Sequence, residues 1–214
     1  MRIANLTLIT FAVFTFIFSC AKQDAIKIAC VGDSITYGSG IKGRDSLAYP
    51  PQLNKLLGDK YLVKNYGISA RTLLSKGDFP YINEQVYKDA LAWEPNIVLI
   101  KLGTNDTKPH NWQHGDEYKN DYIRLIKSFQ DLDSHPKVIL IKPVPAFQTI
   151  WGISDTVIVD EIIPTIDEIS KEMNLQTMDL HYPMLNDSTL FPDHIHPNAK
   201  GAAKMAKIIY EQIK

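Results

Sequence analysis

The stretch "NIVLIKLGTND" (96–106) begins with an almost continuous run of apolar residues and ends in a glycine followed by polar residues. A strand covered on both faces has this composition, whereas a strand with one exposed face alternates apolar and polar residues. A similar run, "KVILIK", follows at 137–142. Both stretches are therefore predicted to be strands inside a parallel sheet.

Shorter apolar runs and amphipathic stretches alternate along the rest of the chain. Further strands are predicted at 27–31, 61–66 and, more weakly, 175–179. Helices are predicted at 46–58, 84–93, 116–133, 156–173 and 197–213, the last with Pro197 in its first turn. Because each parallel crossover needs a helix-length connection, this order predicts a five-stranded parallel sheet with helices on both faces.

The bulk composition fits one globular domain. The chain has 214 residues, of which 45% are hydrophobic and 22% charged, which is enough to bury a sizeable core. Its formal net charge is −1, and lysines are interspersed with acids rather than gathered in a basic stripe. Nucleic acid is therefore excluded as an expected partner.

Residues 1–20 differ from the rest of the chain and predict an export signal. They contain one arginine and no acid, are largely apolar from Ile3 to Phe18, and end in "IFSC". This ending resembles a bacterial lipoprotein signal, which implies that Cys20 is lipidated and that 21–214 form the mature domain. The expected location is then the periplasmic or outer membrane surface, with the lipid as the sole membrane contact. Cleavage to a soluble secreted protein and an uncleaved anchor are the alternatives.

Only one other cysteine is present, Cys30, which lies inside the apolar run of the first predicted strand. A lone cysteine in such a run is typical of a small core residue. With Cys20 assigned to the lipid, no disulfide is expected within the mature chain.

Polar residues follow four of the five predicted strands. The stretches concerned are "GDSITYG" (32–38), "NYGISART" (65–72), "GTND" (103–106) and "DHIHPN" (193–198). In open parallel sheets the ligand crevice forms at the carboxyl ends of the strands. A serine, a glycine, an asparagine and an Asp plus His pair are therefore expected at one rim.

This set of residues matches the requirements of acyl transfer from an ester to water. A serine hydroxyl becomes nucleophilic when an imidazole accepts its proton, and a carboxylate orients that imidazole. The tetrahedral intermediate also needs hydrogen-bond donors, such as a backbone N–H and an Asn amide, aimed at its oxygen.

The same four stretches, in this order, resemble the conserved blocks of the SGNH hydrolases, also called GDSL-type esterases and lipases. The resemblance implies a three-layer α/β/α, flavodoxin-like fold and a mechanism that needs no cofactor. It assigns Ser34 as the nucleophile, His196 as the general base and Asp193 as its orienting partner. The oxyanion hole would combine the N–H groups of Ser34 and Gly67 with the Asn105 side chain.

Simpler roles exist for each of these residues. Ser34 is also a good helix N-cap, and Asn105 is also a good turn residue. Asp33 is expected to be a structural hydrogen-bonding residue beneath the serine. His194 competes with His196 for Asp193, and the family spacing of three residues selects His196, leaving His194 as a loop or substrate-side residue.

A metal site in "DHIH" is the remaining alternative for this loop. It needs a third ligand, and the spare histidines form no recognisable ligand spacing with it. These histidines are His110, His114 and His181. No metal is therefore predicted.

The substrate is indicated less directly. The loops at 108–118 and 143–154 are short and polar, and each contributes a tryptophan, Trp112 or Trp151, that either stacks on a sugar or anchors its loop. Arg71 either meets an anionic substrate group or forms a surface ion pair. Exported family members with short loops resemble carbohydrate O-acetylesterases, including those acting on acetylated sialic acid or plant polysaccharides.

The expected activity is therefore hydrolysis of small acyl esters, above all acetyl esters, on sugars. A lysophospholipase or general lipase would use the same triad but need an apolar groove. A catalytically silent glycan-binding lipoprotein is the non-enzymatic alternative.

Overall fold

Five parallel strands form the central sheet of the protein, for which a computed structural model describes residues 24–213. The strands are β1 (Ile26–Gly32), β2 (Tyr61–Gly67), β3 (Ile97–Lys101), β4 (Lys137–Lys142) and β5 (Gln176–Asp179). Their order in the sheet is β2-β1-β3-β4-β5. This is the flavodoxin-like order, in which the chain reverses direction across the sheet after β2.

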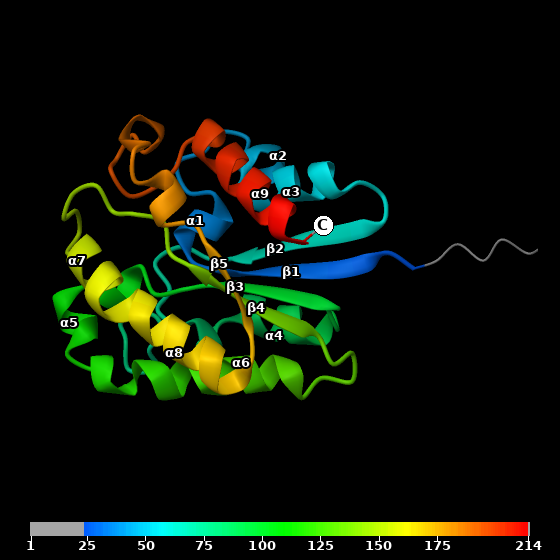
Figure 1. The fold of residues 1–214 in the computed structure, drawn as a ribbon, viewed down its shortest axis with the longest axis horizontal. Coiled ribbons are helices and arrows are strands. Elements are labelled where there is room, and N and C mark those ends of the chain that lie inside the picture. The colour runs from blue at the N-terminus through cyan, green and yellow to red at the C-terminus, as the bar shows by residue number, and fades with distance from the viewer. Residues whose placement is uncertain (1–23, 214) are drawn as a thin grey trace, which may run out of the picture.

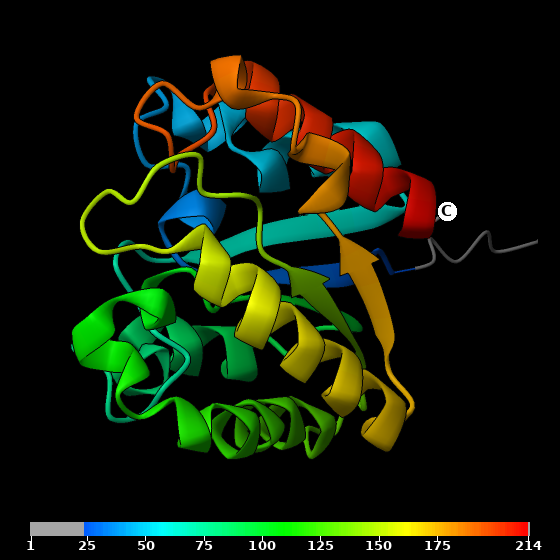
Figure 2. The same ribbon diagram turned by 60° about the vertical axis from the view of Figure 1, so that its left-hand side comes forward.

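Helices cover both faces of the sheet (Figures 1 and 2). One face carries α3 (Tyr49–Leu57) and α9 (Ala199–Ile213). The other carries α4 (Gln85–Ala92), α6 (Tyr118–Gln130) and α8 (Ile163–Met173). The predicted three-layer α/β/α architecture is confirmed.

The strand sequences explain these layers. Successive side chains of a strand point to opposite faces, so Ile28 and Cys30 of β1 pack under α3 and α9, whereas Ala29 and Val31 pack under the other helices. All four are fully buried. Cys30 is accordingly a free cysteine in the core.

The carboxyl ends of the strands lie at one end of the molecule, on the left in Figure 1, where several short helices gather. These are α1 (Ser34–Tyr37), α5 (Pro109–Trp112) and α7 (Asp155–Val157). The short helix α2 (Arg44–Leu47) lies beside α3, nearer the middle of the view. Single 3₁₀ turns lie at Tyr81–Asn83, Asn105–Thr107, Gly115–Glu117, Tyr182–Met184 and Ser188–Leu190. The segments expected to carry the site thus meet at this rim.

Three helices differ from the sequence prediction. The helix expected from Pro197 begins at Ala199, because the Asn198 side chain accepts hydrogen bonds from the N–H groups of Lys200 and Gly201. The helix expected at 46–58 is divided into α2 and α3, and the second begins with prolines in its first turn. The helix expected at 156–173 contains a π turn over Ile158–Ile162.

This π turn precedes Pro164, which lies at the start of α8. Proline has no N–H to donate, and its ring crowds the preceding turn. Pro164 therefore accounts for the change from α-helical to π-helical hydrogen bonding just before it.

Within residues 24–213 no helix is both long enough and apolar enough to cross a membrane. The export signal predicted at 1–20, with lipidation of Cys20, lies outside the described residues and stays a prediction.

Candidate active site

Ser34, His196 and Asp193 form a continuous hydrogen-bonded chain at the rim of the sheet. His196 Nε2 lies 2.8 Å from Ser34 Oγ, although the two residues are 162 positions apart in the sequence. His196 Nδ1 lies 2.8 Å from Asp193 Oδ2. These distances suit proton transfer from the hydroxyl to an imidazole whose other nitrogen donates to a carboxylate.

The local fold of the "DHIHPN" loop fixes Asp193. Its Oδ1 accepts hydrogen bonds from the backbone N–H groups of Ile195 (3.0 Å) and His196 (2.6 Å). Burial by itself raises the pKa of Asp193, but these N–H groups and the His196 imidazole outweigh it, and the net pKa lies below its ordinary value. Asp193 is therefore ionised at neutral pH and favours the His196 tautomer with hydrogen on Nδ1.

The turn between β1 and α1 presents the serine. Asp33, not Ser34, is the N-cap of α1, because its Oδ1 accepts from the Ile35 N–H at 2.9 Å. Gly32 permits the tight turn, since a Cβ there would lie 2.2 Å from Thr36 Oγ1. The Ser34 hydroxyl is thereby left for His196 instead of serving as a cap.

Asn105 also reaches the pocket that contains Ser34 and His196. One hydrogen of its amide is donated to the Arg71 carbonyl, with Nδ2 at 3.1 Å from that oxygen. Because a primary amide has two hydrogens to donate, the second remains for a ligand. The position predicted for Asn105 as an oxyanion donor is compatible with this geometry.

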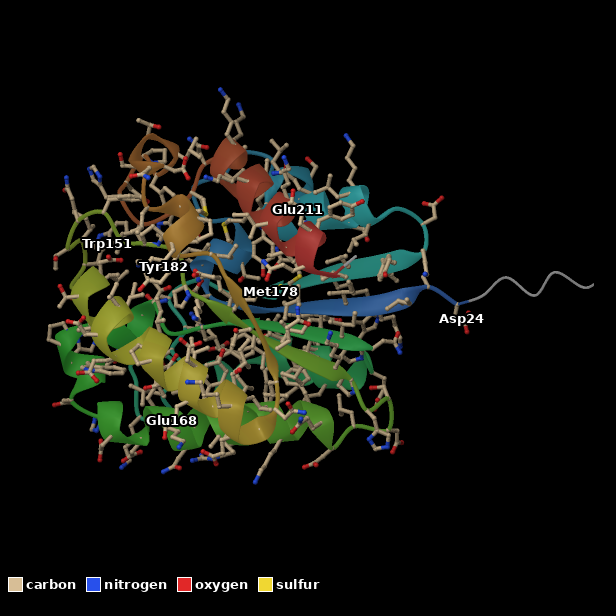
Figure 3. The ribbon with its side chains drawn as sticks, viewed as in Figure 1. Asp24, Trp151, Glu168, Met178, Tyr182 and Glu211 are labelled. Atoms are coloured by element: carbon tan, nitrogen blue, oxygen red, sulfur yellow. The ribbon has the colours of Figure 1, made fainter. Side chains whose placement is uncertain are left out.

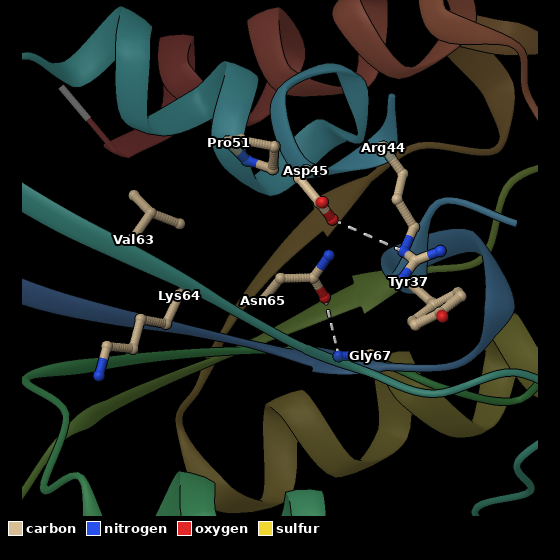
Figure 4. A pocket seen from close by; sticks show the side chains of 8 residues that line it. All are labelled: Tyr37, Arg44, Asp45, Pro51, Val63, Lys64, Asn65 and Gly67. Atoms are coloured by element: carbon tan, nitrogen blue, oxygen red, sulfur yellow. Dashed lines mark hydrogen bonds and ion pairs between the residues drawn. The ribbon is translucent and has the colours of Figure 1, made fainter. Parts of the chain in front are cut away.

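Gly67 lies elsewhere, and this differs from the prediction. Its N–H donates to Asn65 Oδ1 at 2.8 Å. It packs directly on α1, where a Cβ would lie 2.3 Å from the Tyr37 nitrogen. Figure 4 shows it at the edge of a separate hollow of about 380 Å³ beside Tyr37 and Arg44. The Gly67 N–H is therefore already used and does not line the pocket of Ser34.

Ala70, three residues later, occupies the place predicted for Gly67. It lines the pocket together with Ser34, Asn105 and His196. Its φ of 67° is in the left-handed region, which is strained for a residue with a side chain. Among the described residues, no hydrogen-bond partner is found for the Ala70 N–H. The sequence prediction missed Ala70 because it assigned the backbone donor of the stretch "NYGISART" to Gly67.

Arg71 holds the Ala70 segment in place instead of facing a substrate. Its Nη2 lies 2.7 Å from Glu84 Oε1, its Nη1 donates to the Ser69 carbonyl at 2.8 Å, and its guanidinium lies over Phe79. The ion-pair alternative weighed for Arg71 is therefore the observed arrangement.

The other three substrate-side candidates differ in position. Trp112 packs on Tyr118 with ring centroids 5.6 Å apart, as a loop anchor would. His194, at a φ of 68°, accepts the Phe147 N–H through its carbonyl and does not line the pocket of Ser34. Trp151 is 61% exposed (Figure 3). The centroid of its ring lies 5.7 Å from that of the His196 ring. Trp151 is thus the candidate that the fold brings to the site.

The pocket itself is small, with a volume of about 230 Å³. It is lined by Ser34, Ser39, Ser69, Ala70, Asn105, Lys108, Trp151, Ile153 and His196. A second hollow of about 170 Å³ is also lined by His196, together with Ser39, Gly40 and Asn198. The two hollows share Ser39 and His196, so space for a larger substrate continues past the imidazole.

Asp106 is a buried acid that the sequence prediction did not use. Its two carboxylate oxygens accept the N–H groups of Leu73 (3.1 Å) and Leu74 (2.8 Å), which ties the end of β3 to the segment that carries Ala70. Burial raises the pKa of Asp106 to about 7, although these N–H groups lower it.

This raised pKa predicts a pH-dependent contribution to stability. Between about pH 4 and pH 7 the folded state binds a proton that the unfolded state has released, so the free energy of unfolding falls as pH rises through this window. Relative to Asp106→Asn, the wild type is expected to lose stability from pH 4 to pH 7. Urea unfolding of both proteins across this range measures the difference, and parallel pH profiles would contradict it.

The metal alternative finds no support in the described part of the chain, 24–213, where no group of three or more His, Cys, Asp or Glu side chains could hold an ion. His181 is buried against Asp155, with its Nε2 3.2 Å from Oδ1, and takes no part in the "DHIH" loop site.

Comparison with known proteins identifies the family of the chain. Residues 30–204 match the GDSL-like Lipase/Acylhydrolase family. An acetylxylan esterase from Xylanibacter ruminicola is 51% identical over 211 residues, which cover 90% of this chain and 44% of that protein. A multidomain esterase from Ruminococcus flavefaciens is 28% identical over 224 residues, covering 88% of this chain and 28% of that one. The chain thus spans less than half the length of these curated relatives.

Solved structures share the fold at low sequence identity. A putative arylesterase from Agrobacterium tumefaciens superimposes with a TM-score of 0.69 at 20% identity, covering 87% of this chain and 97% of that one. A two-domain esterase active on acetylated mannans gives 0.66 at 22%, covering 88% of this chain and 49% of that one. An acetyl xylan esterase gives 0.67 at 19%, covering 88% and 100%.

Proposed function

Because the chain belongs to the GDSL-like lipase/acylhydrolase family, we propose that it is a serine esterase that removes acetyl groups from carbohydrates. The observation that carries this proposal is the chain of hydrogen bonds from Ser34 through His196 to Asp193 at the edge of a small pocket. The 51% identity to an acetylxylan esterase supports the choice of acyl group and of sugar substrate.

The proposed reaction begins with attack of Ser34 Oγ on the ester carbonyl carbon while His196 Nε2 takes the hydroxyl proton. The oxygen of the tetrahedral intermediate accepts hydrogen bonds from the Ser34 N–H, the Ala70 N–H and Asn105 Nδ2. His196 then gives its proton to the departing sugar oxygen, and the carbon–oxygen bond breaks. A water molecule repeats the sequence on the acetyl-serine and releases acetate.

The size and polarity of the site support a short acyl chain and a polar leaving group. The pocket has a volume of only about 230 Å³ and is lined in part by Ile153 and Trp151, so its size suits an acetyl group better than a long acyl chain. The second hollow, which His196 also lines, is bordered by Ser39 and Asn198, whose polar groups can hydrogen-bond sugar hydroxyls. A lipase would instead be expected to line this route with apolar side chains.

A substrate panel tests this proposal. Purified protein is expected to release acetate from acetylated xylan or mannan, or acetylated sialic acid, and to prefer p-nitrophenyl acetate to longer p-nitrophenyl esters. Acetate is measured by an enzyme-coupled assay, with chemically deacetylated glycan as the control. Faster turnover of long-chain esters would favour the lipase alternative, and glycan binding without acetate release would favour the silent binding protein.

Trp151 is expected to contribute to glycan binding rather than to the chemical step. Trp151→Ala should raise KM for acetylated xylan about three- to tenfold, because ring stacking is worth roughly 0.5–1.5 kcal/mol. The same variant should change kcat/KM for p-nitrophenyl acetate by less than about threefold, since that ester lacks the sugar. Equal losses on both substrates would show that Trp151 supports His196 instead.

A further inference from the structure

A single lysine ends the otherwise apolar strand β3 and is fully buried. Lys101 Nζ lies 3.0 Å and 2.9 Å from the two carboxylate oxygens of Asp33, and 3.3 Å from Thr104 Oγ1. Neither side chain of the Lys101–Asp33 ion pair is exposed. All three hydrogens of the ammonium group therefore have an acceptor inside the protein.

Stability alone does not explain this pair. Removing two charges from water is costly, and apolar residues of similar volume often stabilise a protein as well or better at such a position. The neighbours of Lys101 in β3, Leu99 and Ile100, are buried apolar residues of the kind that would fill the position. A buried lysine here therefore indicates that the charge of Asp33 is retained for another reason.

Asp33 fixes the turn that carries the proposed nucleophile. It precedes Ser34 in the chain, and its Oδ1 also accepts the Ile35 N–H at 2.9 Å, which fixes the first turn of α1. Lys101 in turn contacts Thr104, the residue before Asn105. The pair therefore joins the end of β1, with the nucleophile, to the end of β3, with the proposed oxyanion donor.

We propose that Lys101 is a positioning residue that neutralises Asp33, so that Asp33 can hold Ser34 without an unbalanced negative charge beside the reacting ester. This inference rests on the proposed role of Ser34. Negative charge develops on the carbonyl oxygen during attack, and a second uncompensated anion in the same buried region would oppose it. The same anion would favour the protonated form of His196, which cannot act as the base.

Three variants separate charge from structure: Lys101→Met, Asp33→Asn and the double variant. Asparagine is as good an N-cap as aspartate, so Asp33→Asn keeps the cap and removes the charge. Lys101→Met is expected to lower kcat of p-nitrophenyl acetate hydrolysis about 100-fold with little change in KM. The double variant is expected to recover activity to within about tenfold of wild type.

The pH dependence gives the signature that a merely structural role would not produce. In Lys101→Met the acidic limb of the kcat/KM profile is expected to move to higher pH by about half a unit or more, since an uncompensated anion is left near His196. In Asp33→Asn an uncompensated cation should move it to lower pH, and the double variant should return it to the wild-type position.

An NMR titration of the His196 ring, assigned by comparison with His196→Gln, repeats this test without turnover. If the wild type hydrolyses no ester, the proposed function fails, whereas the ring titrations still decide the role of Lys101. Displacements of the His196 titration in opposite directions in the two single variants support the proposal. If Lys101→Met does not fold, the proposal is tested by whether the His196 titration moves to lower pH in Asp33→Asn and returns to the wild-type position in the double variant. Unchanged titrations, or a double variant no more active than the weaker single variant, would overturn it.

Discussion

Replacement of Ser34 by alanine is expected to lower kcat for p-nitrophenyl acetate and acetylated xylan by at least about 10⁴-fold. The loss is this large because the nucleophile, its base and the orienting acid act as one unit in such enzymes. Ser34 Oγ is the atom that His196 Nε2 contacts at 2.8 Å. Without it the imidazole has no hydroxyl to deprotonate, and only hydrogen bonding to the substrate carbonyl remains.

The matched control is Ser46→Ala. Ser46 is an exposed residue of α2, and its hydroxyl donates to the Gly43 carbonyl at 3.2 Å. This variant should retain wild-type turnover within about twofold, since surface substitutions have small effects. Initial rates and circular dichroism of the three proteins are compared. A folded Ser34→Ala protein that retained a tenth of the wild-type kcat would exclude Ser34 as the nucleophile.

His196→Ala is expected to produce a loss of similar size, again at least about 10⁴-fold in kcat. His196 is the imidazole that lies between Ser34 Oγ and Asp193 Oδ2, and its removal breaks both hydrogen bonds. Because a base must take the proton before the attack is complete, adding imidazole to the assay should restore part of the activity.

His194→Asn is the control from the same loop. His194 has a φ of 68°, a conformation that asparagine tolerates, and its carbonyl, not its ring, accepts the Phe147 N–H. Its kcat should stay within about threefold of wild type. A loss in His194→Asn as large as that in His196→Ala would contradict the assignment of the general base.

The fold was predictable because its signal is repeated along the chain. Runs such as 96–102 and 137–142 are apolar on both faces, and only a sheet covered by two helical layers buries both. Element ends were less predictable, since they depend on single side chains. Asn198 displaces the start of the last helix by two residues, and Pro164 accompanies the π turn.

The candidate site was predictable where its residues have distinctive side chains. Ser34, Asn105, Asp193 and His196 were identified in sequence, and the structure brings all four together. Ala70 was missed because its contribution is a backbone N–H, which leaves no trace in residue type. Gly67, three residues earlier, was the more obvious candidate for a backbone donor, yet its N–H already donates to Asn65 Oδ1.

Lys101 was missed for a different reason. Within "NIVLIKL" it resembles a strand-end lysine that extends into solvent, and nothing local indicates that Asp33, 68 positions away, lies at hydrogen-bond distance. Such pairs depend on the register between β1 and β3, in which Gly32 faces Lys101. Only the assembled sheet reveals this register.

The most direct test of the account is to trap the acetyl-enzyme. The wild-type protein is mixed with p-nitrophenyl acetate, quenched with acid within one turnover and digested, and the peptide that contains Ser34 is analysed by mass spectrometry. The account predicts that this peptide gains the mass of one acetyl group on Ser34, and that the gain is absent from Ser34→Ala and abolished by prior reaction with a serine-directed organophosphate. Acetyl found on another residue, or hydrolysis that persists after Ser34 has been blocked, would contradict it.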